Sequence, residues 1–183
     1  MITTIFTSKK LEKITKSLIE DYNEKLPEIS KLGKWNATVF YVYRKKCWLV
    51  TNSRTRYSVI LANVKSSDLS QINRLFKEAL HRQMNYDSVS ITPEEIDILI
   101  GDLRFNPTDN DRRTIGFQNS HLSTLEYRKD QYGMLENWPI TQIVHFLNNT
   151  YFYWNKPKMT EGTYPVTELR KELETLETDL NTL

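Results

Sequence analysis

Cysteine is almost absent from this chain of 183 residues, and glycine and proline are sparse. Cys47 stands alone, which excludes a disulfide framework and a zinc site built from cysteines. No linker or repeat interrupts the sequence. No stretch approaches the ~20 consecutive apolar residues of a membrane-spanning helix, and the first residues lack the charge-then-apolar order of a secretion signal. We therefore expect a cytoplasmic protein that does not enter a membrane.

The known signatures of catalysis and cofactor binding are missing as well. The chain contains no GxGxxG, no GxSxG, no P-loop lysine motif and no HExxH. His81, His121 and His145 do not share a metal-ligand spacing, and no cysteine accompanies them. We read His81 and His145 as structural residues on helices. We expect neither a metal nor a cofactor.

The composition, with 39% hydrophobic and 26% charged residues, is that of a globular domain. Residues 35–43, 47–52 and 56–63 are rich in Val, Tyr, Trp and Ile and are separated by short polar turns, which predicts an antiparallel three-stranded meander. Residues 2–7 and 103–105 predict two further short strands. Helices are expected from Leu11 to before Pro27, from a cap at Ser67 to Leu80, from a capping box at Thr92, over residues 120–132, and from Pro139 and Pro165 onward.

Together these elements predict an α+β fold, in which an antiparallel sheet of three to five strands packs against about six helices. Residues 1–164 form a single domain in this prediction. Residues 165–183 form a C-terminal amphipathic helix that is either part of the domain or an interface.

The segment DRRTIGFQNS, residues 111–120, is predicted to be a loop that leads into a helix capped by Asn119 or Ser120. A second interpretation is an anion site, because arginines beside a helix N-terminus favour negative charge. Its candidate residues, with His121 as a general base, are Arg112, Arg113, Gly116, Asn119 and His121. Under the loop interpretation, Gly116→Val damages folding more than Arg112→Ala does.

Two segments resemble a bacterial family of unknown function, which has an LG-x-W strand and a later Arg-Ser/Thr-x-x-Gly-x-x-Asn segment. The strand LGKWNATVFYVYRKKCWLVTN ends in Thr51 and Asn52, as in that family. Arg113, Thr114, Gly116 and Asn119 match the later segment, whereas Ser120 replaces an aspartate. The resemblance implies a single compact domain and marks residues 111–120 as a shared feature, but it implies no reaction.

The turns of the predicted meander are basic, and aromatic residues lie between them. Basic groups beside exposed rings are what single-stranded nucleic acid requires, although aromatic residues in sheets are more often core. Basic residues also outnumber acidic ones in residues 1–60, whereas acidic residues dominate the remainder. The candidate nucleic-acid-binding residues are Arg44, Lys45, Lys46, Arg54 and Arg56.

The C-terminal helix carries an apolar seam at alternating spacings of three and four residues. This seam either lies on the protein's own core or pairs with a second copy across a two-fold axis. The residues of the homodimer interpretation are Val166, Leu169, Leu173, Leu176 and Leu180.

The sequence as a whole favours a non-catalytic domain that binds a macromolecular partner, an unknown protein in the first instance. Two alternatives remain open at this point: a nucleic-acid-binding protein, and an enzyme that processes RNA or nucleotides. The arrangement of the basic residues separates these interpretations, because a shared basic face would favour the alternatives.

Overall fold

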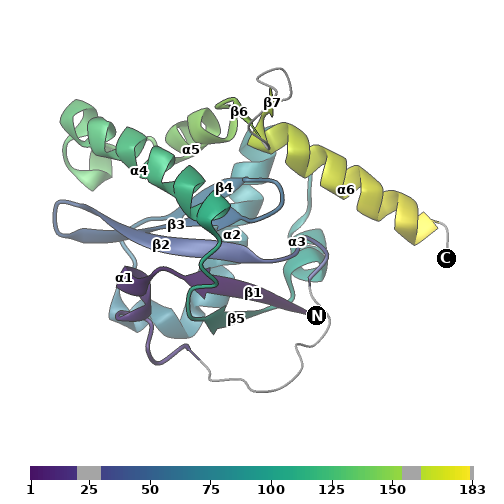
Figure 1. Ribbon diagram of the computed structural model, residues 1–183, viewed down its shortest axis with the longest axis horizontal. Helices are drawn as coiled ribbons and strands as arrows, with labels where there is room; N and C mark the ends of the chain where they lie inside the picture. Colours follow the sequence, from purple (N-terminus) through teal and green to yellow (C-terminus); the bar gives the residue numbers. More distant parts are fainter. Residues whose placement is uncertain (20–29, 154–161, 182–183) are drawn as a thin grey trace.

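The structure is a computed structural model that describes residues 1–19, 30–153 and 162–181, with the side chains of the last helix described as far as residue 176 (Figure 1). Its elements in chain order are β1 (Ile2–Thr7), α1 (Lys9–Glu12), β2 (Trp35–Val42), β3 (Lys45–Asn52), β4 (Ser58–Leu61), the 3-10 helix η1 (Ser66–Gln71), α2 (Ile72–Tyr86), α3 (Pro93–Ile100), β5 (Asp102–Asn106), α4 (Arg112–Tyr132), the 3-10 helix η2 (Leu135–Asn137), α5 (Ile140–Asn148), β6 (Phe152–Tyr153), β7 (Gly162–Thr163) and α6 (Pro165–Asn181).

The central sheet has five strands in the order β4-β3-β2-β1-β5. The expected meander is confirmed, because β2, β3 and β4 pair antiparallel. The expectation of an all-antiparallel sheet is wrong, since β1 runs parallel to both β2 and β5. Short turns force neighbouring strands to reverse, but residues 8–34 form a connection long enough for a parallel crossover. The α+β class and the approximate number of helices are as expected.

Both faces of the sheet are covered. Trp48 and Val50 point to one face and pack with Leu11, α2 and α3, together with Val166 and Leu169 of α6. The alternate residues of the same strand, Cys47 and Leu49, point to the other face and pack with α4, η2 and α5. Burial on both faces explains why these strands read as continuous apolar runs in the sequence. Figure 1 shows α4 crossing the sheet and α6 extending away to one side.

Several helix boundaries differ from the expected ones. The capping box at Thr92 is confirmed, with Thr92 Oγ1 accepting from the N–H of Glu95 and the Glu95 carboxylate accepting from the N–H of Thr92. Ser67 is not a cap, because it lies inside η1. The first helix is a single turn, α1, although Leu11 is buried as expected. Its predicted end before Pro27 lies outside the described residues.

Candidate functional site

The segment 111–120 is helical rather than a loop. Asp111 is the N-cap of α4, and its Oδ1 accepts hydrogen bonds from the backbone N–H groups of Arg113 (3.1 Å) and Thr114 (3.2 Å). The helix therefore starts at Arg112, eight residues before the start expected at residue 120. Aspartate is a strong capping residue, and the exposed face of α4 accommodates Gly116, whose backbone is helical.

The N-terminus of α4 is already occupied by the protein's own carboxylates. Asp111 Oδ2 also accepts from the hydroxyl of Thr114 at 2.8 Å. Lys34 Nζ lies 2.5 Å from Asp109 and 3.9 Å from Asp111. Burial would raise the pKa of Asp111, but the hydrogen bonds from Thr114 and the charges of Arg56 and Lys34 outweigh it and lower the pKa. The charged carboxylate supplies the negative charge that an external anion would bring to this helix end.

Arg56 connects the turn after β3 to the start of α4. Its side chain is buried, its backbone is left-handed (φ 63°), and its Nη1 donates to the hydroxyl of Thr114. Burial lowers the pKa of Arg56, against the opposing effect of the nearby Asp111 carboxylate. Gln118 adds a second connection by donating to the carbonyl of Asn36 at 2.8 Å. The two segments that carry the family resemblance thus lie against each other.

The anion-site candidates are split between opposite faces of α4. Arg112, Arg113, Gly116 and Asn119 are exposed. His121 points the other way, is 3% exposed, and packs edge-on against Phe117 with ring centroids 4.3 Å apart. Burial lowers the pKa of His121 to about 4, so the imidazole is neutral at pH 7. The structure therefore does not bring His121 together with the two arginines.

The basic residues of the meander lie at opposite ends of β3. Arg44 and Lys45 lie at the β2–β3 turn, and Lys45 pairs with Glu136. Arg54 lies beyond the other end of the strand and pairs with Glu172 at 2.7 Å. Arg56 is buried, as described above. These five candidates, which include Lys46, do not form one face, and among the interleaved aromatic residues Trp35, Trp48 and Tyr57 belong to the core.

At the hairpin end of the sheet, exposed lysines follow β1. The chain leaves β1 beside Ala37, where Ser8 N donates to Ala37 O at 2.8 Å, and α1 then follows alongside β2. Figure 1 places α1 and the β2–β3 turn at the same end of the sheet. Tyr41 and Lys46 are directly opposite in the strand register, so their side chains leave the sheet on the same face. We call this region the lysine surface and define it as Lys9, Lys10, Lys13, Lys16, Tyr41 and Lys46.

The sequence-based interpretation did not identify the lysine surface, because none of its lysines belongs to a recognisable motif. The four lysines of the α1 region are all exposed. One carboxylate of the same segment, Glu12, is half-buried among them. The excess of basic residues in the first third of the sequence was the available signal. It could not show that α1 lies beside the hairpin turn.

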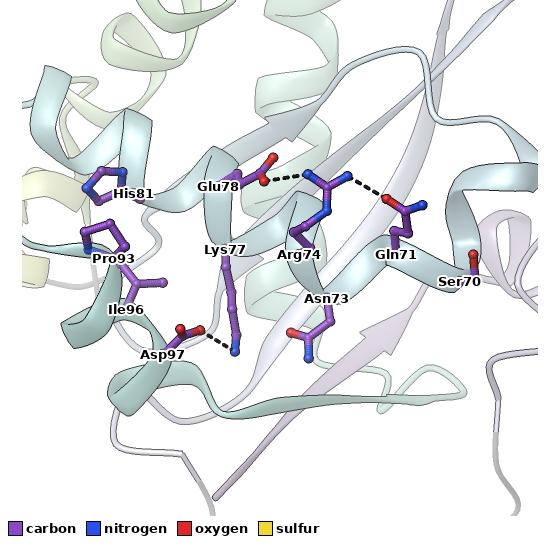
Figure 2. A pocket seen from close by; sticks show the side chains of 10 residues that line it. All are labelled: Ser70, Gln71, Asn73, Arg74, Lys77, Glu78, His81, Pro93, Ile96 and Asp97. Atoms are coloured by element: carbon purple, nitrogen blue, oxygen red, sulfur yellow. Dashed lines mark hydrogen bonds and ion pairs between the residues drawn. The ribbon is translucent and has the colours of Figure 1, made fainter.

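A groove of about 520 Å³ runs between α2 and α3 (Figure 2). Its two principal cations already face carboxylates: Arg74 Nη1 lies 2.6 Å from Glu78, and Lys77 Nζ lies 2.7 Å from Asp97. Arg74 also donates to Gln71 at 2.6 Å. Because these charges are compensated within the groove, it has little electrostatic preference for a charged ligand.

Within the part of the chain that the structure describes, no three His, Cys, Asp or Glu side chains lie close enough together to hold a metal ion. None of the described helices combines the length and the apolar character needed to cross a bilayer.

The model of one protein family matches residues 4–168, and that family is described as a domain of unknown function, DUF6933. The match confirms the resemblance to an uncharacterised domain family. A search of curated proteins finds no match to this chain.

Proposed function

Since the chain belongs to this family of unknown function, we propose its role from its own geometry: it is a macromolecule-binding domain whose lysine surface binds single-stranded nucleic acid. The observation that carries the proposal is the gathering of exposed lysines beside an exposed tyrosine at one end of the sheet. The candidates Arg54 and Arg56 are not part of this surface. Of the five residues that the sequence nominated for nucleic-acid binding, Lys46 belongs to the lysine surface. Arg44 lies next to it in the β2–β3 turn.

Charge supports a polyanionic partner. Lys9, Lys10, Lys13 and Lys16 fall within eight positions of the sequence, and each is exposed. Such a density of lysines attracts a phosphate backbone because binding releases the counterions condensed on it. The affinity should therefore fall steeply as salt rises.

Exposed rings favour nucleic acid over an acidic protein. Tyr41 is 43% exposed and Tyr43 is 63% exposed, so both present ring area to solvent next to the lysines. A base stacked on such a ring gains about 1–3 kcal/mol. An acidic polypeptide would use the same charges but would gain little from the rings.

The test measures binding of a fluorescently labelled single-stranded oligonucleotide by anisotropy at low and at moderate salt. We expect Lys13→Glu/Lys16→Glu to weaken binding and to reduce the steepness of the salt dependence. Arg112→Glu/Arg113→Glu changes the net charge equally at exposed residues outside the lysine surface, and it should leave binding close to that of the parent. Tyr41→Ala should weaken binding about 5- to 100-fold.

Three results would overturn the proposal. One is the absence of binding at low salt. Another is equal weakening by the lysine pair and the arginine pair, which would indicate attraction by net charge alone. The third is tighter binding of polyglutamate than of the oligonucleotide with no effect of Tyr41→Ala, which would identify the partner as an acidic protein.

A further inference from the structure

A second polar cluster lies where the C-terminal end of α2 meets α5 and the start of α6. Its centre is the carboxylate of Asp87, whose side chain has no exposed surface. Asp87 Oδ2 accepts from Tyr57 Oη at 2.6 Å and from Asn148 Nδ2 at 3.1 Å. Asp87 Oδ1 accepts from Gln83 Nε2 at 3.2 Å and lies 2.6 Å from Nδ1 of His145. The carboxylate is thus surrounded by four potential donors.

These hydrogen bonds favour one tautomer of His145. An ionised carboxylate only accepts, and four donors fill its lone-pair positions. Burial, the charge of Asp87 and the hydrogen bond to it all raise the pKa of Tyr57, so the phenol keeps its proton and donates. The amides of Gln83 and Asn148 also donate. The arrangement therefore favours the His145 tautomer with its proton on Nδ1, directed at Asp87.

The other ring nitrogen of His145 faces outward. The His145 side chain is 47% exposed although its partner carboxylate is buried. Its ring is held edge-on against Tyr86, with centroids 5.5 Å apart. Asn149 Nδ2 lies 3.3 Å from Nδ1, but it donates at 2.9 Å to the His145 carbonyl. With Nδ1 committed to Asp87, Nε2 is the nitrogen that can exchange a proton with a ligand.

A cation is held by the same aspartate residue. Arg170 of α6 donates from Nη2 to the backbone carbonyl of Asp87 at 2.7 Å. Arg170 is an exposed residue, and a guanidinium has further N–H groups that can bind an anionic group. An imidazole oriented by a carboxylate, with a cation bound to the same residue, is an arrangement suited to general acid–base catalysis on an anionic substrate.

We propose that His145, oriented by Asp87, is the general base of a hydrolytic site for small esters that carry a carboxylate, which Arg170 binds. Water attacks the ester carbonyl carbon, and Nε2 takes one of its protons. The new C–O bond replaces the bond to the alcohol, whose oxygen receives the proton back from Nε2. No other reactant is required. Asp87 is a positioning residue in this scheme, because it touches His145 and not the substrate.

The experiment uses two 4-nitrophenyl esters, the neutral acetate and the anionic hemisuccinate, and records release of nitrophenolate by the full-length protein. We expect hydrolysis about 100-fold faster than with an equal concentration of free imidazole. His145→Gln should remove this acceleration for both esters. His81→Gln, a change of the same chemistry on α2, should leave it intact. Arg170→Gln should raise KM for the hemisuccinate and leave the acetate unaffected.

The role of Asp87 has its own readout. Asp87→Asn should lower kcat with little change in KM, and ¹⁵N spectra should show the Nδ1 proton of His145 shifting between the two ring nitrogens. If that variant does not fold, the comparison of His145→Gln with His81→Gln still decides the proposal, since residue 145 is half exposed. A parent rate equal to that of free imidazole would overturn the proposal, as would equal losses in the two histidine variants.

This site is independent of the lysine surface. Its residues lie on or beside α2, α5 and α6 and none belongs to the lysine surface, and its test involves no nucleic acid. Failure of the esterase test would leave the binding proposal standing, and failure of oligonucleotide binding would leave the esterase proposal standing.

Discussion

Arg56 Nη1 donates a hydrogen bond to the hydroxyl of Thr114, which joins the turn after β3 to the first turn of α4 across 58 positions of sequence. Both side chains are buried. A buried guanidinium that loses an acceptor carries part of its desolvation cost uncompensated.

Thr114→Val should therefore lower the free energy of unfolding by about 1–3 kcal/mol. Thr124→Val is the matched control, because the Thr124 hydroxyl donates to the Ser120 carbonyl in the preceding turn of the same helix. Urea unfolding followed by circular dichroism measures both. The Thr114 variant also loses the hydroxyl that donates to Asp111, so equal stability of the two variants would show that neither hydrogen bond contributes.

Gly116→Ala should stabilise the protein by about 0.5–1 kcal/mol, because glycine in a helix interior is unfavourable relative to alanine. The position is exposed, and a Cβ built there meets no atom within 4 Å among the described residues. The sequence-based expectation that Gly116→Val is damaging rested on a loop that does not exist, so valine should be tolerated. A melting temperature below that of the parent for Gly116→Ala would contradict this account.

Protonation of His121 should destabilise the fold in acid. Its pKa falls from 6.5 to about 4 on folding, since burial disfavours the charged form. Between these values the unfolded state binds more protons, so stability present above pH 6.5 is lost as the pH falls toward 4. The shift corresponds to about 3 kcal/mol. His121→Leu should remove this component, and subtracting the two stability-versus-pH curves isolates it from carboxylate titrations common to both proteins. A difference that is flat from pH 7.5 to 4 would refute it.

Ser88→Gly should stabilise the end of α2. Ser88 has a left-handed backbone (φ 58°), and the N–H of Val89 returns to the carbonyl of Met84, as in a glycine-terminated helix. Glycine adopts this conformation without the penalty that serine pays, so we expect a gain of about 0.5–1 kcal/mol in thermal or urea unfolding. Ser90→Gly, two positions later at an exposed site of ordinary φ, should give no such gain.

The apolar seam of α6 begins inside the chain's own core. Val166 and Leu169 are buried, and Leu173 and Leu176 pack against the same cluster. Leu169→Ala should therefore cost about 2–5 kcal/mol. The homodimer expected through this seam stays a prediction. Its Leu180 side chain lies outside the described residues.

Light scattering of a chain truncated after Leu176 tests the homodimer with the core contacts retained. A dimeric parent that becomes a folded monomer supports pairing through the end of α6. A parent that is monomeric at high concentration excludes it.

The sequence predicts what short-range patterns determine. The meander follows from apolar runs separated by short turns, and the helix at Thr92 follows from a capping box. The parallel pairing of β1 was not predictable in the same way, because Ile2–Thr7 pair with residues about 30 and 100 positions away, and no local signal specifies those partners.

Among the site residues too, short-range patterns were informative and long-range contacts could not be predicted. The start of α4 was predicted eight residues too late because the cap signal of Asp111 was read as part of a polar loop. His145 was read as an ordinary helical histidine because its partner, Asp87, lies 58 positions earlier in the sequence. Charge asymmetry indicated a basic region, but only the packing of α1 beside β2 identifies which lysines share a surface.

The place of β1 between β2 and β5 has a consequence for how the chain folds during synthesis. The meander and the helix after it can form from contiguous sequence, but β1 cannot be enclosed on both edges until residues 102–106 have left the ribosome. At a translation rate of about 5–20 residues per second, one edge of β1 stays unpaired for several seconds. Long-range pairing of this kind slows folding and exposes a β edge to other chains. Three of the six residues of β1 are threonines, Thr3, Thr4 and Thr7. They make this strand less apolar than the central strands of the meander.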